Sequence, residues 1–334
     1  PYVVDPRERI QIGGELIDPD EFARLTSRLW PVAERIGEVT EFEFKTALGF
    51  LAWQEAGCEW VALETGLGGR FDATNVVTPR VCAIVSISLD HTAILGRTER
   101  EIAFEKAGIL KPGVPAVLGR DLDAASRETI ERVAAEKGAT IVAPVHTVAR
   151  EEGGRFAVSR PEGTIAGLRP GIVGPHSAAN AALALDALRA AGLRPTDDEI
   201  RTGIAAARLP GRGEIRFHLG RTVMLDGAHN VGSASAVPYL LKDERAGGTE
   251  GAVLVTNMLA GHDADAFFAA IAPEFREAIV VPIDFPRALS TEETAAKLRS
   301  LGLYVTIAES VREGLDIAAE RGPVVVTGSF YLVG

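Results

Sequence analysis

Two apolar runs that each end in a residue able to bind a metal ion constrain the fold of this chain most. Residues 60–63 read Trp-Val-Ala-Leu and end at Glu64, and residues 81–89 end at Asp90 and His91. Short apolar runs bounded by turn residues are typical of strands buried in a parallel sheet. The sequence therefore predicts strands at 60–64 and 81–88, each with a polar residue after its last apolar position.

A third group belongs to the same region. A helical segment at about 98–107 delivers Lys106 just before Gly108. Because ligands of parallel sheets gather at the carboxyl ends of strands, we expect Glu64, His91 and Lys106 to come from neighbouring element ends.

The alternation of helix and strand continues through the first two hundred residues. Thr40 followed by Glu43 is a capping box, and it starts a helix that runs to about residue 56. Asp18 or Asp20 is the expected N-cap of an earlier helix that ends near residue 32. The remaining predicted elements are strands at 116–119 and 139–143, helices at 123–137 and 196–206, and a hairpin-rich stretch at 145–169. The stretch 174–180 is expected to open a further, alanine-rich helix that ends at residue 190. This order predicts a parallel sheet with helices on both faces.

A second α/β domain is predicted after the break at residues 209–213, Leu-Pro-Gly-Arg-Gly. Its expected strands lie at 222–225, 252–256, 278–281, 304–307 and 323–327. We therefore expect one domain at 1–209 and a smaller one at 210–334.

Composition excludes several classes of function. The chain has 334 residues, is 46% hydrophobic and carries a net charge of −11, so it can bury two cores but offers no basic surface for nucleic acid. Its longest apolar runs are too short to span a bilayer. Cys58 and Cys82 lie in apolar contexts and are expected to be reduced thiols, as in a cytoplasmic protein.

The chemistry of Glu64, His91 and Lys106 suits a divalent cation. A carboxylate and an imidazole can hold Mg²⁺ where phosphates supply the other ligands. An amine is a poor ligand for Mg²⁺, so Lys106 would contribute only as a carbamate. Taken singly, each residue has a structural alternative: a capping acid, a hydrogen-bonded turn histidine and a solvated lysine at a helix end.

Other candidates lie in loops. The stretch 66–75, Gly-Leu-Gly-Gly-Arg-Phe-Asp-Ala-Thr-Asn, allows close approach of a ligand but lacks the spacing of a dinucleotide fingerprint. The turn 226–230, Asp-Gly-Ala-His-Asn, could orient a nucleotide or could be a tight turn that bonds to its own backbone. Arg212 is a candidate phosphate clamp. His146, His218 and His262 show no partner pattern and are expected to be structural or exposed.

Six ordered motifs together resemble the folylpolyglutamate synthase/dihydrofolate synthase family, the folate branch of the Mur-type amide ligases. They are LETGLGGRFDATNVV, SISLDHTAILG, EIAFEKAGILKPGVP, LPGRGE, LDGAHN and VVVTGSFYLVG. The resemblance covers nearly the whole chain. It implies a Mur-ligase-like parallel-sheet ATPase domain followed by a smaller Rossmann-like domain.

The resemblance also implies a reaction. ATP would phosphorylate a pterin-linked carboxylate, and L-glutamate would displace the phosphate to form an amide with dihydropteroate or with the glutamate of a folate. Mg²⁺ would be held by Glu64, His91 and carbamylated Lys106, and K⁺ is a further cation to consider. Asp226 and His229 would act with these three groups in catalysis. ATP would be bound by Asn180, Arg212 and Asp226. The substrate-binding residues would be Thr40, Phe42, Gly69, Arg70, Asp72, Ala73, Asn75, His229 and Ser329.

Some points stay open at this stage. The family's phosphate-binding loop has no counterpart in these residues, and we expect it upstream of Pro1, where the sequence begins without Met. The alternatives are a Mur-type amino-acid ligase, or a non-catalytic homologue that binds a pterin or nucleotide if no such loop precedes the chain. Dihydrofolate synthesis, polyglutamate addition and both together remain possible, and a monomer is the default expectation.

Overall fold

The computed structural model describes residues 3–243 and 251–334. The chain divides into two compact units. The first comprises residues 1–147 and 179–194, and the second comprises 148–178 and 195–334. The boundary expected after residue 209 stays a prediction.

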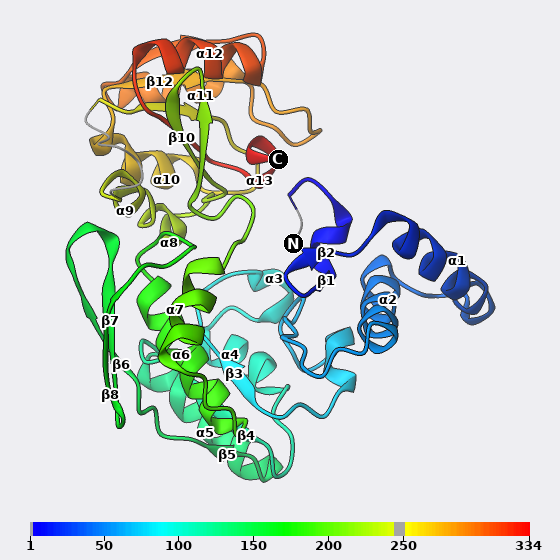
Figure 1. Cartoon of the computed structure of the whole chain (residues 1–334). Coiled ribbons are helices and arrows are strands. Elements are labelled where there is room, and N and C mark those ends of the chain that lie inside the picture. The colour runs from blue at the N-terminus through cyan, green and yellow to red at the C-terminus, as the bar shows by residue number, and fades with distance from the viewer. Residues whose placement is uncertain (1–2, 244–250) are drawn as a thin grey trace. The chain divides into compact units, whose positions relative to one another are not determined.

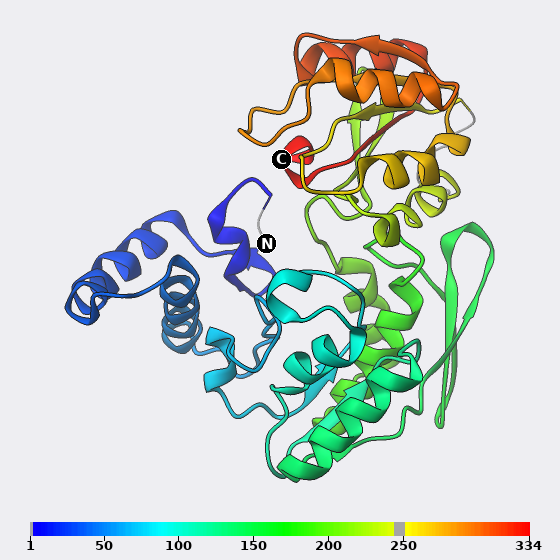
Figure 2. The same ribbon diagram turned by 180° about the vertical axis from the view of Figure 1, so that it is seen from behind.

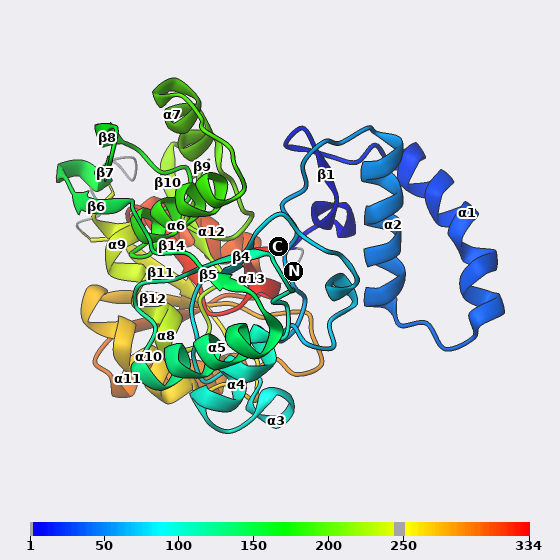
Figure 3. The ribbon, with the colours of Figure 1, turned by 90° about the horizontal axis from the view of Figure 1, so that it is seen from below.

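The first unit contains a pair of helices and a small parallel sheet. Helix α1 (Pro19–Ile36) starts at Asp18, whose carboxylate accepts hydrogen bonds from the amides of Asp20 and Glu21. Helix α2 (Glu41–Glu55) starts at the predicted capping box of Thr40 and Glu43. The two helices lie side by side in Figure 3, next to the hairpin of β1 (Gln11–Ile12) and β2 (Glu15–Leu16).

The sheet of the first unit has the order β3 (Cys82–Ile84), β4 (Pro115–Leu118) and β5 (Thr140–Ile141), all parallel. Helices α4 (Glu99–Ala107) and α5 (Ala124–Lys137) pack on it through a shared apolar core that includes Ala103, Leu118 and Ile130. The long helix α5 faces the viewer in Figure 2. Asp123 caps this helix, as expected of an acidic residue before a helix. The short helix α3 (Thr92–Leu95) precedes α4.

Two expected strands of the first unit differ from the structure: the prediction at 60–64 is wrong, and the one at 81–88 is too long. Residues 60–64 are not in a strand, and Trp60 and Val61 are 51% and 43% exposed. Ladder hydrogen bonds need a neighbouring strand, and within the described ranges none pairs with this segment. The expected strand at 81–88 is reduced to β3, because β4, its one partner among the described strands, ends at Leu118.

The second unit contains a six-stranded sheet (Figure 1). The strand order is β13-β12-β11-β14-β10-β9, and Figure 1 labels β10 and β12 of this sheet. Five strands are parallel and correspond to the predicted ones: β10 (Arg221–Asp226), β11 (Val253–Thr256), β12 (Glu277–Val280), β13 (Tyr304–Ile307) and β14 (Val324–Thr327). The antiparallel edge strand β9 (Glu214–His218) was not predicted, because its alternation of polar and apolar residues follows directly on a glycine-rich break.

Helices cover both faces of this sheet. One apolar core joins it to α8 (Val231–Ala234), α9 (Val237–Leu241), α10 (Ala264–Ile271) and α11 (Thr291–Ser300). A second core joins the other face to α12 (Val311–Arg321) and α13 (Phe330–Val333). The unit is thus a three-layer α/β/α fold, and the carboxyl ends of its parallel strands share one edge.

The remaining elements include the predicted excursion and the helices that follow it. Strands β6 (Thr147–Arg150), β7 (Phe156–Arg160) and β8 (Gly163–Leu168) form a separate sheet, in which β7 and β8 are antiparallel. Helices α6 (Ser177–Ala190) and α7 (Asp197–Ala206) follow. In the first unit, the buried Asp186 of α6 accepts hydrogen bonds from the amides of Val145 and His146 and pairs with the His146 ring at 2.8 Å. No helix in the described part of the chain is long and apolar enough to cross a membrane.

Candidate functional site

The glycine loop at residues 66–75 packs on the end of helix α4, which carries Lys106. The Arg70 amide donates to the Glu105 carbonyl at 2.9 Å. A Cβ on Gly69 would lie 3.0 Å from the Lys106 carbonyl oxygen, and one on Gly108 would lie 2.3 Å from the Arg70 Cα. The glycines therefore serve a close backbone contact that brings the loop and the end of α4 together.

Asp72 organises the loop from inside. Its carboxylate accepts hydrogen bonds from the Leu67 amide at 2.8 Å, the Thr74 amide at 2.9 Å and the Thr74 hydroxyl at 2.6 Å. Asn75 donates to the carbonyl oxygens of Arg70 at 3.0 Å and Gly108 at 3.3 Å. The side chains of two predicted substrate residues, Asp72 and Asn75, thus hold the loop, and Ala73 begins the short helix η2 (Ala73–Val76) within it.

Phe42 lies beside this loop. A Cβ on Gly66 would lie 2.3 Å from the Phe42 ring, so the ring occupies the space that any other residue would fill. Thr40 has a structural role as well, because its hydroxyl bonds to Glu43 in the capping box of α2. The fold therefore brings the start of α2, the glycine loop and the end of α4 into one region of the first unit.

Glu64, His91 and Lys106, the three predicted metal ligands, make no direct contact with one another in the described part of the chain. Glu64 is exposed and Lys106 is partly buried, and neither side chain has a hydrogen-bond or ion-pair partner there. His91 adopts left-handed backbone angles, with φ 49° and ψ 37°, and its side chain is 59% exposed. Left-handed backbone is uncommon for a residue other than glycine and is enriched at functional sites.

The donor set fits a hard cation in part. Glu64 offers an uncommitted carboxylate and His91 an exposed imidazole, whereas the Lys106 amine would have to become a carbamate to donate oxygen. Within the described ranges, no three His, Cys, Asp or Glu side chains are grouped to hold a metal ion.

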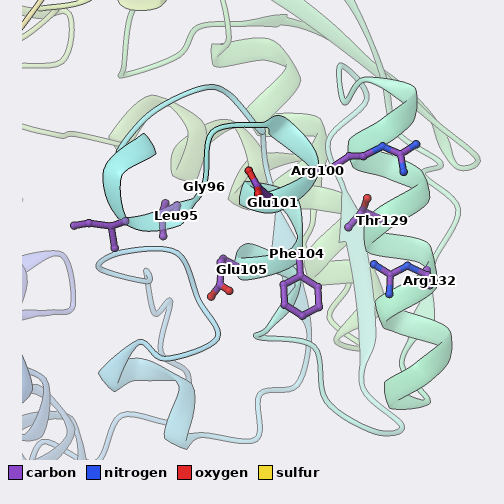
Figure 4. Close-up of a pocket in the computed structure, with 9 residues that line it drawn as sticks. Leu95, Gly96, Arg100, Glu101, Phe104, Glu105, Thr129 and Arg132 are labelled. Carbon is purple, nitrogen blue, oxygen red and sulfur yellow. The ribbon is translucent and has the colours of Figure 1, made fainter.

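An open pocket of about 440 Å³ lies between α3, α4 and α5 (Figure 4). In the figure Phe104 and Glu105 extend from α4, while Thr129 and Arg132 extend from α5. Glu105 also approaches Arg70 of the glycine loop, with 3.6 Å between the charged groups. The pocket therefore borders the helix that connects the regions of His91 and Lys106.

In the second unit, Asp226 at the end of β10 is the best-defined polar group. It is 4% exposed, and its carboxylate accepts hydrogen bonds from the amides of Gly213 and Ala228, both at 2.9 Å. Burial raises the pKa of Asp226, while these two amides and the nearby charges of Arg212 and His229 oppose the rise. The carboxylate thus ties the 209–213 loop to the end of the strand.

The ends of three parallel strands are connected at this edge. The Gly328 amide after β14 donates to the Ala228 carbonyl at 2.9 Å. The Thr256 hydroxyl at the end of β11 donates to the Thr327 carbonyl at 2.7 Å. These buried bonds fix the loops that follow β10, β11 and β14 relative to one another.

Arg212 and His229 both contact the Phe330 ring. The Arg212 guanidinium lies 4.4 Å from the ring centroid, and the His229 ring packs edge-on at 5.9 Å. Ser329 is buried and caps helix α13 by accepting a hydrogen bond from the Tyr331 amide at 3.1 Å. Arg212, Asp226, His229 and Ser329, which are four of the predicted site residues, therefore lie together at the carboxyl ends of the parallel strands. Asn180 lies exposed in α6 of the first unit.

His262 also contacts this group of residues. It was expected to be structural or exposed, and it does lie exposed, but its ring contacts that of His229 with 4.8 Å between centroids. A usable signal was present, because His262 follows strand β11 by a few residues and polar groups after parallel strands tend to gather.

Comparison with known proteins gives a consistent result. No family model matches the chain. The dihydrofolate synthase/folylpolyglutamate synthase of Mycobacterium tuberculosis is 32% identical over 390 residues, which cover 100% of this chain and 78% of the relative. The protein of the same name from Escherichia coli is 33% identical over 342 residues, which cover 100% of this chain and 77% of the relative.

Solved structures agree in fold. Mycobacterium tuberculosis folylpolyglutamate synthase, complexed with ADP and AMPPCP, matches with a TM-score of 0.87 and 30% identity over 100% of this chain and 81% of that one. The bifunctional folylpolyglutamate synthase/dihydrofolate synthase of Yersinia pestis, complexed with AMPPNP and a Mn ion, matches with a TM-score of 0.83 and 31% identity over 100% of this chain and 78% of that one.

Proposed function

Because this chain belongs to the dihydrofolate synthase/folylpolyglutamate synthase family, we propose that it is an ATP-dependent ligase that joins L-glutamate to a pterin-linked carboxylate. The acceptor is dihydropteroate, or the terminal glutamate of a folate. Family membership carries the proposal. The group formed by Arg212, Asp226, His229 and Ser329 in the second unit supports it. Family membership also favours this reaction over that of a Mur-type amino-acid ligase, and over a binding protein without turnover.

The reaction has two steps. The acceptor carboxylate attacks the γ-phosphorus of ATP, which forms an acyl phosphate and releases ADP. The amine of L-glutamate then attacks the acyl carbon, phosphate leaves with the bonding electrons, and the amine gives up a proton. A mixed anhydride is needed because a carboxylate alone is a poor electrophile at neutral pH.

In the first unit, we assign the start of α2 and the glycine loop to the pterin acceptor. Phe42 offers an aromatic face, and the loop is held rigid by Asp72 and by its contact with α4. Glu64, His91 and Lys106, the last as a carbamate, would hold Mg²⁺. When bound, that cation would neutralise the charge of the phosphates during transfer.

In the second unit, we assign Arg212 and Asp226 to ATP, and His229 and Ser329 to L-glutamate. The guanidinium of Arg212 can form paired hydrogen bonds with phosphate oxygens while Phe330 supports its flat face. Asp226 keeps the Arg212 loop in place through the Gly213 amide. Asn180 of the first unit is proposed to contact the adenine.

The test uses the full-length protein with ATP, Mg²⁺ and L-glutamate, and either dihydropteroate or a reduced folate as acceptor. We expect ADP release that depends on both the acceptor and L-glutamate, and a product heavier by one glutamyl residue in the mass spectrum. Comparison of the two acceptors determines which activity is present. Binding of acceptor without ADP release would contradict the proposal.

A further inference from the structure

The contact between His229 and His262 is not used by the proposed reaction. The two rings lie 4.8 Å apart between centroids, with 57° between their planes. His229 is partly buried after β10, and His262 is exposed after β11. They belong to loops far apart in sequence, so the contact exists only because β10 and β11 end at the same sheet edge.

The hydrogen bonding of His229 leaves one ring nitrogen for a ligand. Nδ1 lies 2.7 Å from the Gly227 carbonyl oxygen. A carbonyl oxygen can only accept, so Nδ1 carries the hydrogen. In the neutral ring Nε2 then holds the lone pair, and it is the nitrogen that can accept a hydrogen bond from a substrate.

Two aromatic rings contact the His229 ring. Phe330 contacts it edge-on at 5.9 Å, and His262 contacts it at 4.8 Å. Phe330 is itself confined, because its ring lies 2.4 Å from the point where a Cβ on Gly227 would sit. A single hydrogen bond at Nδ1 fixes the tautomer of His229, whereas contacts with two neighbouring rings restrict its rotation.

The loop that carries His262 is anchored firmly enough to serve this purpose. Asn257, at the end of β11, is fully buried, and its side-chain amide donates to the Val281 carbonyl at 2.9 Å. Its side-chain oxygen accepts from the Met258 amide at 2.8 Å. Ala260, two residues before His262, donates its amide to the Arg287 carbonyl at 2.7 Å.

We propose that His262 is a positioning residue of the amino-acid site, which holds the His229 ring so that Nε2 keeps one direction in which to accept a hydrogen bond from the ammonium group of L-glutamate. This inference rests on the proposed function of His229. It assigns the role of His262 to its ring, not to its nitrogen atoms.

Two substitutions in the full-length protein test the inference. His262→Ala removes the ring, and we expect the KM for L-glutamate to rise about tenfold while the KM for ATP changes little, because an unrestrained ring loses most of its oriented population. His262→Phe keeps a flat ring, and its KM should stay within about threefold of wild type. His218→Ala is the matched control, since His218 of the same unit pairs with Asp316 at 2.6 Å and should leave both KM values unchanged.

The outcomes separate the possible roles. Equal losses in the alanine and phenylalanine variants would mean that a His262 nitrogen contacts substrate, and an unchanged KM in both would mean that the ring contact is incidental; either result overturns the proposal. Because His262 is exposed, both variants are expected to fold, which thermal unfolding checks.

A readout without turnover separates this inference from the proposed function. Nitrogen–proton correlation spectra should show one Nδ1-protonated ring state for His229 in the wild type and in His262→Phe, and a second ring state in His262→Ala. Spectra of His229 that are identical in all three proteins would overturn the inference even if glutamate ligation is confirmed. If the wild type shows no ligation but the spectra change as expected, the positioning contact stands and the proposed function fails.

Discussion

The backbone of Arg70 lies so close to Gly108 that a Cβ there would be 2.3 Å from the Arg70 Cα. This contact joins the glycine loop to the end of the helix that carries Lys106. We predict that Gly108→Ala displaces the loop, destabilises the protein by about 1–3 kcal/mol through overpacking and raises the KM for the pterin acceptor.

Gly203→Ala provides the control for this substitution. No atom lies within 4 Å of a Cβ at Gly203, which is inside helix α7, so alanine there should be neutral or stabilise by up to about 1 kcal/mol. Urea unfolding and acceptor titration measure both effects. Equal stability of the two variants would show that the loop can move aside without cost.

Lys106→Ala should abolish most ADP release, because the residue would no longer supply a carbamate oxygen to the cation. Glu64→Gln and His91→Ala should have the same effect, and all three proteins should remain folded since these side chains are exposed or partly exposed. Activity of the wild type should fall when bicarbonate and CO₂ are removed and recover when they are restored.

Lys297→Ala is the control for loss of a lysine, because Lys297 of α11 pairs with Asp265 of α10 at 2.7 Å in the second unit. It should leave ADP release unchanged. Full activity in Lys106→Ala would refute the carbamate.

Asp226 should make stability depend on pH in a definite direction. Burial raises its pKa above 3.8, so in the window above pH 3.8 the folded protein retains a proton that the unfolded chain has lost. The contribution of Asp226 to the free energy of unfolding therefore falls as the pH rises through that window. The asparagine of the Asp226→Asn variant does not titrate. The free energy of unfolding of the wild type minus that of the variant should therefore decrease as the pH rises and then level off. A difference that increases with pH would contradict the burial effect.

Arg212→Lys should weaken ATP binding about tenfold or more, because an ammonium neither forms paired hydrogen bonds with phosphate nor stacks as a flat group on Phe330. Isothermal titration with ADP and with ATP measures the change. Arg216→Lys, an exposed change on strand β9, should have no effect on nucleotide affinity. Equal affinity in Arg212→Lys would remove this residue from the nucleotide site.

Thr40 has two candidate roles that stability and kinetics can separate. Loss of its capping hydroxyl in Thr40→Ala should cost about 1 kcal/mol, and Thr40→Ser should restore that stability. Other variants that are destabilised by the same amount serve as the reference. If the KM for the acceptor rises more in Thr40→Ala than in those variants, the result supports the predicted contact of Thr40 with the substrate. A change in stability alone would leave Thr40 as a helix cap.

Much of the architecture could be predicted because its signals are local. Thr40 and Glu43 form the expected capping box, and the strands of the second unit match their apolar runs to within a few residues. The apolar run at 60–63 carries an equally clear signal, yet it forms no strand in the described structure. A strand depends on a partner for its hydrogen bonds, and composition alone does not supply one.

The sequence by itself determined the family, the α/β class and the helix starts, and it supplied the candidate site residues that the proposed function uses. Only the tertiary structure decided that Gly108 contacts Arg70 and that His262 contacts His229. Capping and apolar periodicity act within a few residues of one another and can be read along the chain. Ring packing and close backbone approach depend on which strand and helix ends the folded core places side by side, and that placement is a property of the whole unit.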